Sequence, residues 1–431
     1  MPKLHAFAAV RYATDSGDLS ARIAPPYDVL DEGPKQALLA RDAHNIVAID
    51  LPVTPPKTVG PDAAYNAAGD LYRQWLDEGV LHRESNPTLI AYEQQYTVGQ
   101  HQLKRRGLFA ALGVEEFNRP GGGIFRHEHT IAGGTSDRLK LMQATGAQLS
   151  AVFGVFDDPQ QRVAELLADT FAREADFHGT TDNDGVVHRC WVVREPDTIA
   201  ALDEFFGPTD VFIADGHHRY TTALNYAREH PDRAHAASCL FMLVPSSDPG
   251  LIVLPTHRVL CGLEGFEMGE LVKTLEADDR FAIEPTRHGG DGMPQLQQEL
   301  PDAGHHAFGL YDPTRGKTYR VTTTEPDPLA PLMPERAQVW RELDVAVFHH
   351  LFVDEIVRPR FGGDAITYKY PHELTALLRD THDEPGRLGV IMQPTPLQSV
   401  CDVARAGEVM PPKSTFFYPK AATGLVINPV D

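Results

Sequence analysis

Apolar positions along the chain recur both at helical spacing and in the alternating or continuous patterns typical of strands. Alanine, tyrosine, leucine and tryptophan recur at helical spacing over 61–79 before a glycine, which predicts an amphipathic helix. Apolar runs at 87–98 and 104–117 predict two strands that form a hairpin around "GQHQ". The run at 45–52, "NIVAIDLP", is also expected to be a strand that ends at a proline.

The central part of the chain continues to mix both kinds of element. We expect strands at 150–158, 186–195 and 211–214 and helices at 159–175 and 219–229. This mixture predicts an α+β fold.

The pattern changes after Cys261. A helix at 268–280, a strand at 305–312 and an apolar, buried helix at 343–357 indicate a smaller α+β unit. We therefore expect a core domain at 1–260 and a second unit at 261–431, whose aromatic-rich terminal segment packs back on the core.

Composition and charge limit the classes of partner. Apolar residues make up 42% and charged residues 23% of the 431 residues, which is typical of a globular protein. The net charge of -21 argues against binding to nucleic acid or to an anionic membrane, because both require positive surface. No secretory signal, bilayer-length apolar run or zinc-binding cysteine spacing is visible, so we expect a reduced, cytoplasmic protein.

The segment "VFIADGHHRY" joins an apolar strand to a polar helix start. We interpret Asp215 as the N-cap of the helix and Gly216 as the residue that allows the sharp turn. His217, His218 and Arg219 then lie in the first helical turn, beside the positive end of the helix dipole. Backbone amides at a helix start and a guanidinium both bind phosphate, so the turn is predicted to be a phosphate site. The alternative is a purely structural turn.

A second polar segment is "FRHEHT". In an extended chain, His127 and His129 would face one side and Glu128 the other. Glu128 is a candidate general base for a hydroxyl group, with His127 beside it, and a salt-bridged surface loop is the alternative interpretation. Ser136, a few residues later, is expected to cap a helix.

Three further segments offer candidate ligand contacts but no recognised cradle. They are Thr256, His257 and Arg258 after an apolar strand, Tyr27 and Asp28 on a proline-rich turn, and Lys413, Ser414, Thr415 and Lys420 near the end of the chain. The P-loop, GxSxG, HExxH and GxGxxG patterns are all missing from the sequence.

Taken together, the motifs "APPYDV", "FRHEHT", "DRLKLM", "FIADGHHRYTTAL", "LPTHRV" and "PPKSTFFYPKAATGLV" resemble those of the bacterial family called domain of unknown function 1015. That family is similar, at its DGHHR core, to the ParB/sulfiredoxin fold, which includes serine kinases. The resemblance implies a ParB/sulfiredoxin-like mixed sheet with large insertions. It also implies that Asp215, Gly216, His217, His218 and Arg219 form a nucleotide phosphate-binding turn, with Glu128 as the candidate catalytic acid or base.

The leading hypothesis is an enzyme that transfers or hydrolyses a phosphoryl group on a small metabolite, with serine or phosphoserine favoured. An adenine nucleotide, ATP or ADP, and Mg²⁺ are the expected cofactors. In this hypothesis Lys413 and Arg258 offset the charge of the transition state. The alternatives are a nucleotide-binding regulator without turnover and a metal-dependent hydrolase that uses His127, His129, His217 and His218.

Overall fold

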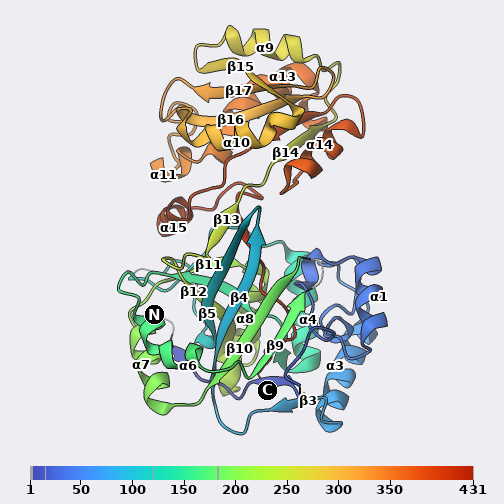
Figure 1. The fold of residues 1–431 in the computed structure, drawn as a ribbon, viewed down its shortest axis with the longest axis vertical. Helices are drawn as coiled ribbons and strands as arrows, with labels where there is room; N and C mark the ends of the chain where they lie inside the picture. The colour runs from blue at the N-terminus through green and yellow to red at the C-terminus, as the bar shows by residue number, and fades with distance from the viewer. Residues whose placement is uncertain (1–2, 15, 120, 182–183, 431) are drawn as a thin grey trace. The chain divides into compact units, whose positions relative to one another are not determined.

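The computed structural model describes residues 3–430, except 15, 120 and 182–183, and divides the chain into two units (Figure 1). The first unit comprises Met1–Ile252 and Pro419–Asp431, and the second comprises Val253–Tyr418. The boundary expected from the sequence, after residue 260, lies inside strand β14 (Arg258–Cys261) of the second unit. The end of the chain belongs to the first unit.

The first unit is built on a mixed sheet. In spatial order its main strands are β6 (Ile124–Phe125), β11 (Val211–Asp215), β8 (Val152–Phe156), β12 (Ser238–Pro245), β5 (His101–Gly113), β4 (Leu89–Val98), β10 (Val186–Val193) and β9 (Phe177–Thr181), and β1 (Leu4–His5) pairs with β5. Strand β11 pairs in parallel with β6 and antiparallel with β8. The predicted α+β class is confirmed.

The most regular sequence patterns give the elements that they predict. The hairpin of β4 and β5 turns between Val98 and His101, which face each other in the register. Helix α3 (Asp62–Asp77) buries its tyrosines and Trp75, as the helical spacing requires.

The prediction of a strand at 45–52 is wrong, because this segment contains the short helix α2 (Val47–Asp50). The side-chain amide of Asn45 donates to the carbonyl oxygens of Ala21 and Ile23, at 2.9 and 3.0 Å, and its Oδ1 accepts from the amide of Val47 at 3.1 Å. The two bonds to Ala21 and Ile23 join Asn45 to a distant part of the chain, and the bond from Val47 closes the turn that starts the helix.

Two helix predictions also need correction. The single helix expected at 159–175 is two short ones, α5 (Arg162–Leu166) and α6 (Ala168–Ala172). Helix α4 (Ala132–Thr145) begins four residues before Ser136, which therefore lies inside it and does not cap it. α4 packs against α3 and α8 (His217–Glu229), and α8 packs on β8 and β12 (Figure 1).

The terminal segment is bonded into the first unit at several places, and two of them bear on the position of Lys420. Strand β21 (Asn428–Pro429) pairs antiparallel with β7 (Ala147–Gln148). The main-chain carbonyl of Lys420 accepts from Nε2 of Gln94 at 3.0 Å, and Oε1 of the same glutamine accepts from Nε of buried Arg105 at 3.0 Å. These contacts fix the position of Lys420.

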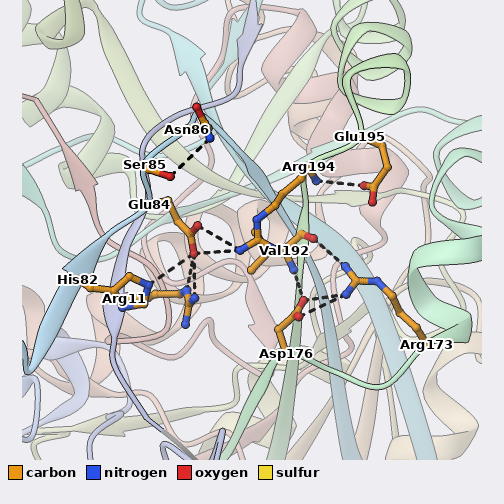
Figure 2. A network of polar contacts seen from close by, with 10 residues as sticks. All are labelled: Arg11, His82, Glu84, Ser85, Asn86, Arg173, Asp176, Val192, Arg194 and Glu195. Carbon is orange, nitrogen blue, oxygen red and sulfur yellow. Dashed lines mark hydrogen bonds and ion pairs between the residues drawn. The ribbon is translucent and has the colours of Figure 1, made fainter.

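A polar network holds a two-stranded ribbon, β2 (Val10–Tyr12) with β3 (Leu81–Arg83), at the end of β10 (Figure 2). Glu84 accepts from Nε of Arg11 at 2.9 Å and from Nη2 of Arg194 at 3.1 Å. Next to it, Asp176 accepts from the amide of Val192 at 2.7 Å. The network contributes to the packing of the ribbon.

The second unit has its own antiparallel sheet, and its strands in spatial order are β15 (Phe281–Gly289), β17 (Lys317–Thr323), β16 (His305–Asp312), β19 (Leu388–Ile391), β14 and β18 (Thr367–Lys369). The expected helix at 268–280 is α9 (Met268–Glu276). The expected buried helix is confirmed, as α12 (Asp344–Val347) that continues into the π-helix η5 (Phe348–Val357). Among the described residues, no helix is long and apolar enough to cross a membrane.

Candidate active site at the start of helix α8

The site begins where β11 ends and α8 starts. The N-cap residue is Gly216, with a positive φ of 96°, and a Cβ at this position would lie 2.9 Å from the guanidinium carbon of Arg219. Glycine is therefore required there. The expected capping role of Asp215 is wrong: this residue ends the strand, and the helix has no side-chain cap.

Asp215 instead holds two cations. Its Oδ1 lies 2.5 Å from Nζ of Lys420, and its Oδ2 lies 2.5 Å from Nη2 of Arg219. Burial would raise the pKa of Asp215, but the charges of Lys420 and Arg219 outweigh it and hold this pKa well below the usual range. The aspartate is therefore ionised at neutral pH.

Arg219 is buried, and its guanidinium also donates to the main-chain carbonyl of Ala151. A phosphate at this turn would have to share Arg219 with Asp215. The phosphate-binding role expected of Arg219 stays a prediction.

Two buried histidines and one carboxylate meet beside the turn. Nε2 of His217 accepts from the amide of His127 at 3.4 Å, so the proton of the neutral ring lies on Nδ1, 3.6 Å from a carboxylate oxygen of Glu128. Burial and the nearby His127 place the pKa of His217 well below its usual value, and burial also lowers the pKa of His127. Both rings are neutral near pH 7, and the side chain of Glu128 is 36% exposed.

The expected shared face of His127 and His129 is wrong. His127 is buried and His129 is exposed, because the chain bends at Glu128 after β6 ends and does not continue as a strand. The carboxylate of Glu128 is thereby close to the neighbouring His217.

His218 brings the start of α4 against the start of α8. Its Nε2 accepts from the amide of Ile131 at 3.0 Å, and a Cβ on Gly134 would lie 2.9 Å from its ring. The glycine cluster at 133–134 thus allows the two helix starts to approach. Neither helix has a side-chain cap, so backbone amides of both are available to an anion.

The proline-rich turn contributes Tyr27 and Asp28 through the short helix η1 (Tyr27–Val29). Oδ2 of Asp28 lies 3.1 Å from Nζ of Lys57, and both side chains are partly exposed. Burial lowers the pKa of His218, Lys57 lowers it further, and Glu128 and Asp28 oppose this shift, so these groups share one electrostatic environment. No sequence motif pointed to Lys57, which is identified only by its contact with Asp28 in the structure.

A buried polar layer lies beneath. Tyr27 is covered by the guanidinium of Arg138, whose carbon is 3.9 Å from the ring centre, and Arg138 also donates to Asp50 and Asp137. A cavity of about 40 Å³ is lined by Asp50, Arg138 and Arg219. It has room for water but not for a metabolite.

The remaining candidates lie in the second unit. Thr256, His257, Arg258 and Ser414 are buried there, Thr415 is partly exposed, and Lys413 is exposed. From the same terminal motif, the structure brings Lys420 to Asp215 within the first unit. The assignment of the second-unit residues to the site at Asp215 stays a prediction.

A metal centre is not formed by these side chains. Among the residues that the structure describes, no three His, Cys, Asp or Glu side chains lie close enough together to hold a metal ion. The four-histidine ligand set of the metal-dependent hydrolase hypothesis is therefore not assembled, and the exposed position of His129 is the reason.

The model of one protein family, described as "Protein of unknown function (DUF1015)", matches residues 4–346. A comparison with curated proteins finds no match.

Solved structures show a partial likeness. A free serine kinase in complex with AMP has 12% identity and a TM-score of 0.32, and the match covers 71% of this chain and 93% of that one. SbnI with a C-terminal truncation, from Staphylococcus aureus, has 10% identity and a TM-score of 0.33, covering 71% and 84%. A conserved hypothetical protein from Pyrococcus furiosus has 13% identity and a TM-score of 0.30, covering 68% and 86%. Scores this low do not transfer a function to this chain.

Proposed function

The chain belongs to the DUF1015 family, and we propose that its first unit catalyses phosphoryl transfer between an adenine nucleotide and a small hydroxylated metabolite. Free serine or phosphoserine is the favoured substrate, and a ParB/sulfiredoxin-like relationship of the core sheet is part of the proposal. The observation that carries it is the exposed carboxylate of Glu128, held beside buried His217 at an uncapped helix start.

Glu128 suits the role of general base. Its side chain is 36% exposed, so it can meet a substrate hydroxyl. Nδ1 of His217 lies 3.6 Å from the carboxylate, and we propose His217 as a positioning residue that comes within hydrogen-bond distance of Glu128 when substrate binds.

Phosphate groups would bind between the two helix starts. Lys420 and Lys57 lie beside Asp215 and Asp28, and an ammonium group has three donors, so each lysine can hold its aspartate and a phosphate oxygen together. With the amides of α4 and α8, these lysines form a local group of hydrogen-bond donors for an anion in an acidic chain.

A nearby cavity suits a nucleobase. It has a volume of about 220 Å³ and an apolar wall that includes Pro25, Leu30 and Leu38, with Thr180 and Thr181 among its polar groups. The turn at 25–30 contributes Asp28 to the polar cluster and its two ends to this cavity. One turn therefore connects an apolar pocket with the proposed phosphate site, as a nucleotide site requires.

Mg²⁺ remains part of the proposal as the partner of the nucleotide. Among the described residues, Asp215 faces Lys420 and Arg219, and Asp28 faces Lys57. A Mg²⁺ ion would therefore be held mainly by the phosphate oxygens of the nucleotide.

The test is nucleotide turnover by the full chain with serine, and with other hydroxylated metabolites, as acceptors. Glu128→Gln should lower the rate about 10²- to 10⁴-fold and leave nucleotide binding within about twofold of the parent chain. Glu116→Gln, at an exposed carboxylate paired with Arg228, is the matched control and should keep full activity. Equal turnover by Glu128→Gln would contradict the proposal, and tight binding without any turnover would favour the regulator.

A further inference from the structure

The second unit contains a buried cation, Arg258, that forms no ion pair with a carboxylate among the described residues. Arg258 is 1% exposed, and its Nη groups donate to the main-chain carbonyls of Thr256 and Lys413. Its Nε has no hydrogen-bond partner among the described residues. Burial lowers the pKa of Arg258 to about 10, so the guanidinium is still charged at neutral pH. A charge buried in this way calls for a counter-ion.

Arg258 lines a polar cavity of about 110 Å³ within the second unit. Pro396 and Ser399 also line it, and they lie at the start of helix α15 (Leu397–Arg405), which has no side-chain cap. A buried, incompletely bonded cation and an uncapped helix start therefore border the same space.

We propose that this cavity is an oxyanion site, in which Arg258 and the start of α15 receive one compact anionic group, a phosphate or a carboxylate. The proposal is independent of phosphoryl transfer in the first unit.

The cavity selects for a small ligand. Its volume corresponds to roughly three or four water molecules, which is the space that a phosphate or acetate ion fills. Two carboxylates, Glu342 and Asp344, lie on its wall, and Asp344 is bonded to Nδ1 of His306 at 2.9 Å. These negative groups repel a polyphosphate, so the ligand carries a single anionic group at this end.

Fluorine NMR of the full chain labelled with 5-fluorotryptophan can observe this site separately. Two of the three tryptophans, Trp75 and Trp191, lie in the first unit, and Trp340 lies in α11 (Gln338–Arg341), which packs on α15. Inorganic phosphate or acetate should shift the Trp340 signal saturably, and the ion that binds more tightly identifies the class of ligand.

Ser399→Asp is the decisive variant. An aspartate in the first turn of α15 is compatible with the helix and supplies the counter-ion itself, so the apparent Kd for the added ion should rise by about tenfold or more. Gln398→Glu adds the same charge one residue away, outside the cavity lining, and should stay within about twofold of the parent chain.

Two results would overturn the proposal. One is a Trp340 signal that neither ion shifts at roughly 10 mM, because a site that is still empty at this concentration binds too weakly to be useful. The other is a Ser399→Asp chain that responds like the parent. A shift of the Trp75 or Trp191 signal alone would place the ion in the first unit and also count against the proposal.

Discussion

At the scale of single residues, the site at the start of α8 depends on Asp215 more than on its histidines. One carboxylate holds Lys420 from the terminal segment and Arg219 from the helix, at 2.5 Å each. The two cations would repel each other without it. Asp215 therefore joins the terminal segment to the site.

The pH dependence of stability should show this role. The pKa of Asp215 is lower in the folded chain than in the unfolded one, so the ionised group stabilises the fold above about pH 4 and this contribution is lost as the pH falls further. Asp215→Asn should lower the free energy of unfolding by about 2 kcal/mol at pH 7, less than for a fully buried pair, because both partners of the Lys420 pair are partly exposed.

Urea unfolding of the full chain at several pH values measures this difference. The loss caused by Asp215→Asn should shrink below about pH 4, where the parent chain also loses its charge. Asp203→Asn, at an exposed position of α7 (Pro196–Phe206), is the control and should change little. A difference that does not vary with pH would contradict the ionised pair.

At the scale of elements, helix α1 (Glu32–Arg41) forms one wall of the proposed nucleobase cavity. Ala37 lines the cavity and is exposed, so Ala37→Trp should fill the space without disturbing the core and weaken ADP binding about tenfold or more. Ala40→Trp, on the same helix but outside the lining, should bind ADP like the parent chain. Isothermal titration gives both affinities. Equal affinities for the two variants would contradict the proposal that the nucleobase binds in this cavity.

The elements also show what sequence pattern can and cannot predict. Helix α3 follows from periodicity, because one face of it packs on the core. The β4–β5 hairpin follows from two apolar runs, which are largely buried on both faces. Helix α2 does not, because its form depends on bonds from Asn45 to Ala21 and Ile23, which are distant in sequence. The apolar pattern of this segment correctly predicted that it is buried, but tertiary contacts decided that it is a helix and not a strand.

The same limit applies to the candidate site. Glu128, His217 and His218 could be singled out because their motifs concentrate polar groups after strands. Lys57 could not, because its contact with Asp28 depends on how the chain folds between them. Lys420 was visible in the sequence only as one of several donors, and its pairing with Asp215, 205 residues away along the chain, is seen only in the structure.

At the scale of the whole molecule, the chain combines a net charge of -21 with a local group of lysines and helix starts. Most of the surface should repel nucleotides, so binding must depend on this group. Lys413 and Lys420 belong to one terminal motif but to different units, which makes them a matched pair for testing where an anion binds.

The most direct measurement is isothermal titration of the full chain with ADP, comparing Lys420→Met with Lys413→Met. The proposed site predicts that Lys420→Met weakens binding about tenfold or more, since the ammonium beside Asp215 is lost. A comparable loss in Lys413→Met would support the separate prediction that Lys413 also contacts the nucleotide. Binding by Lys420→Met that equals the parent, or no binding of ADP by the parent chain itself, would contradict a nucleotide site at the start of α8.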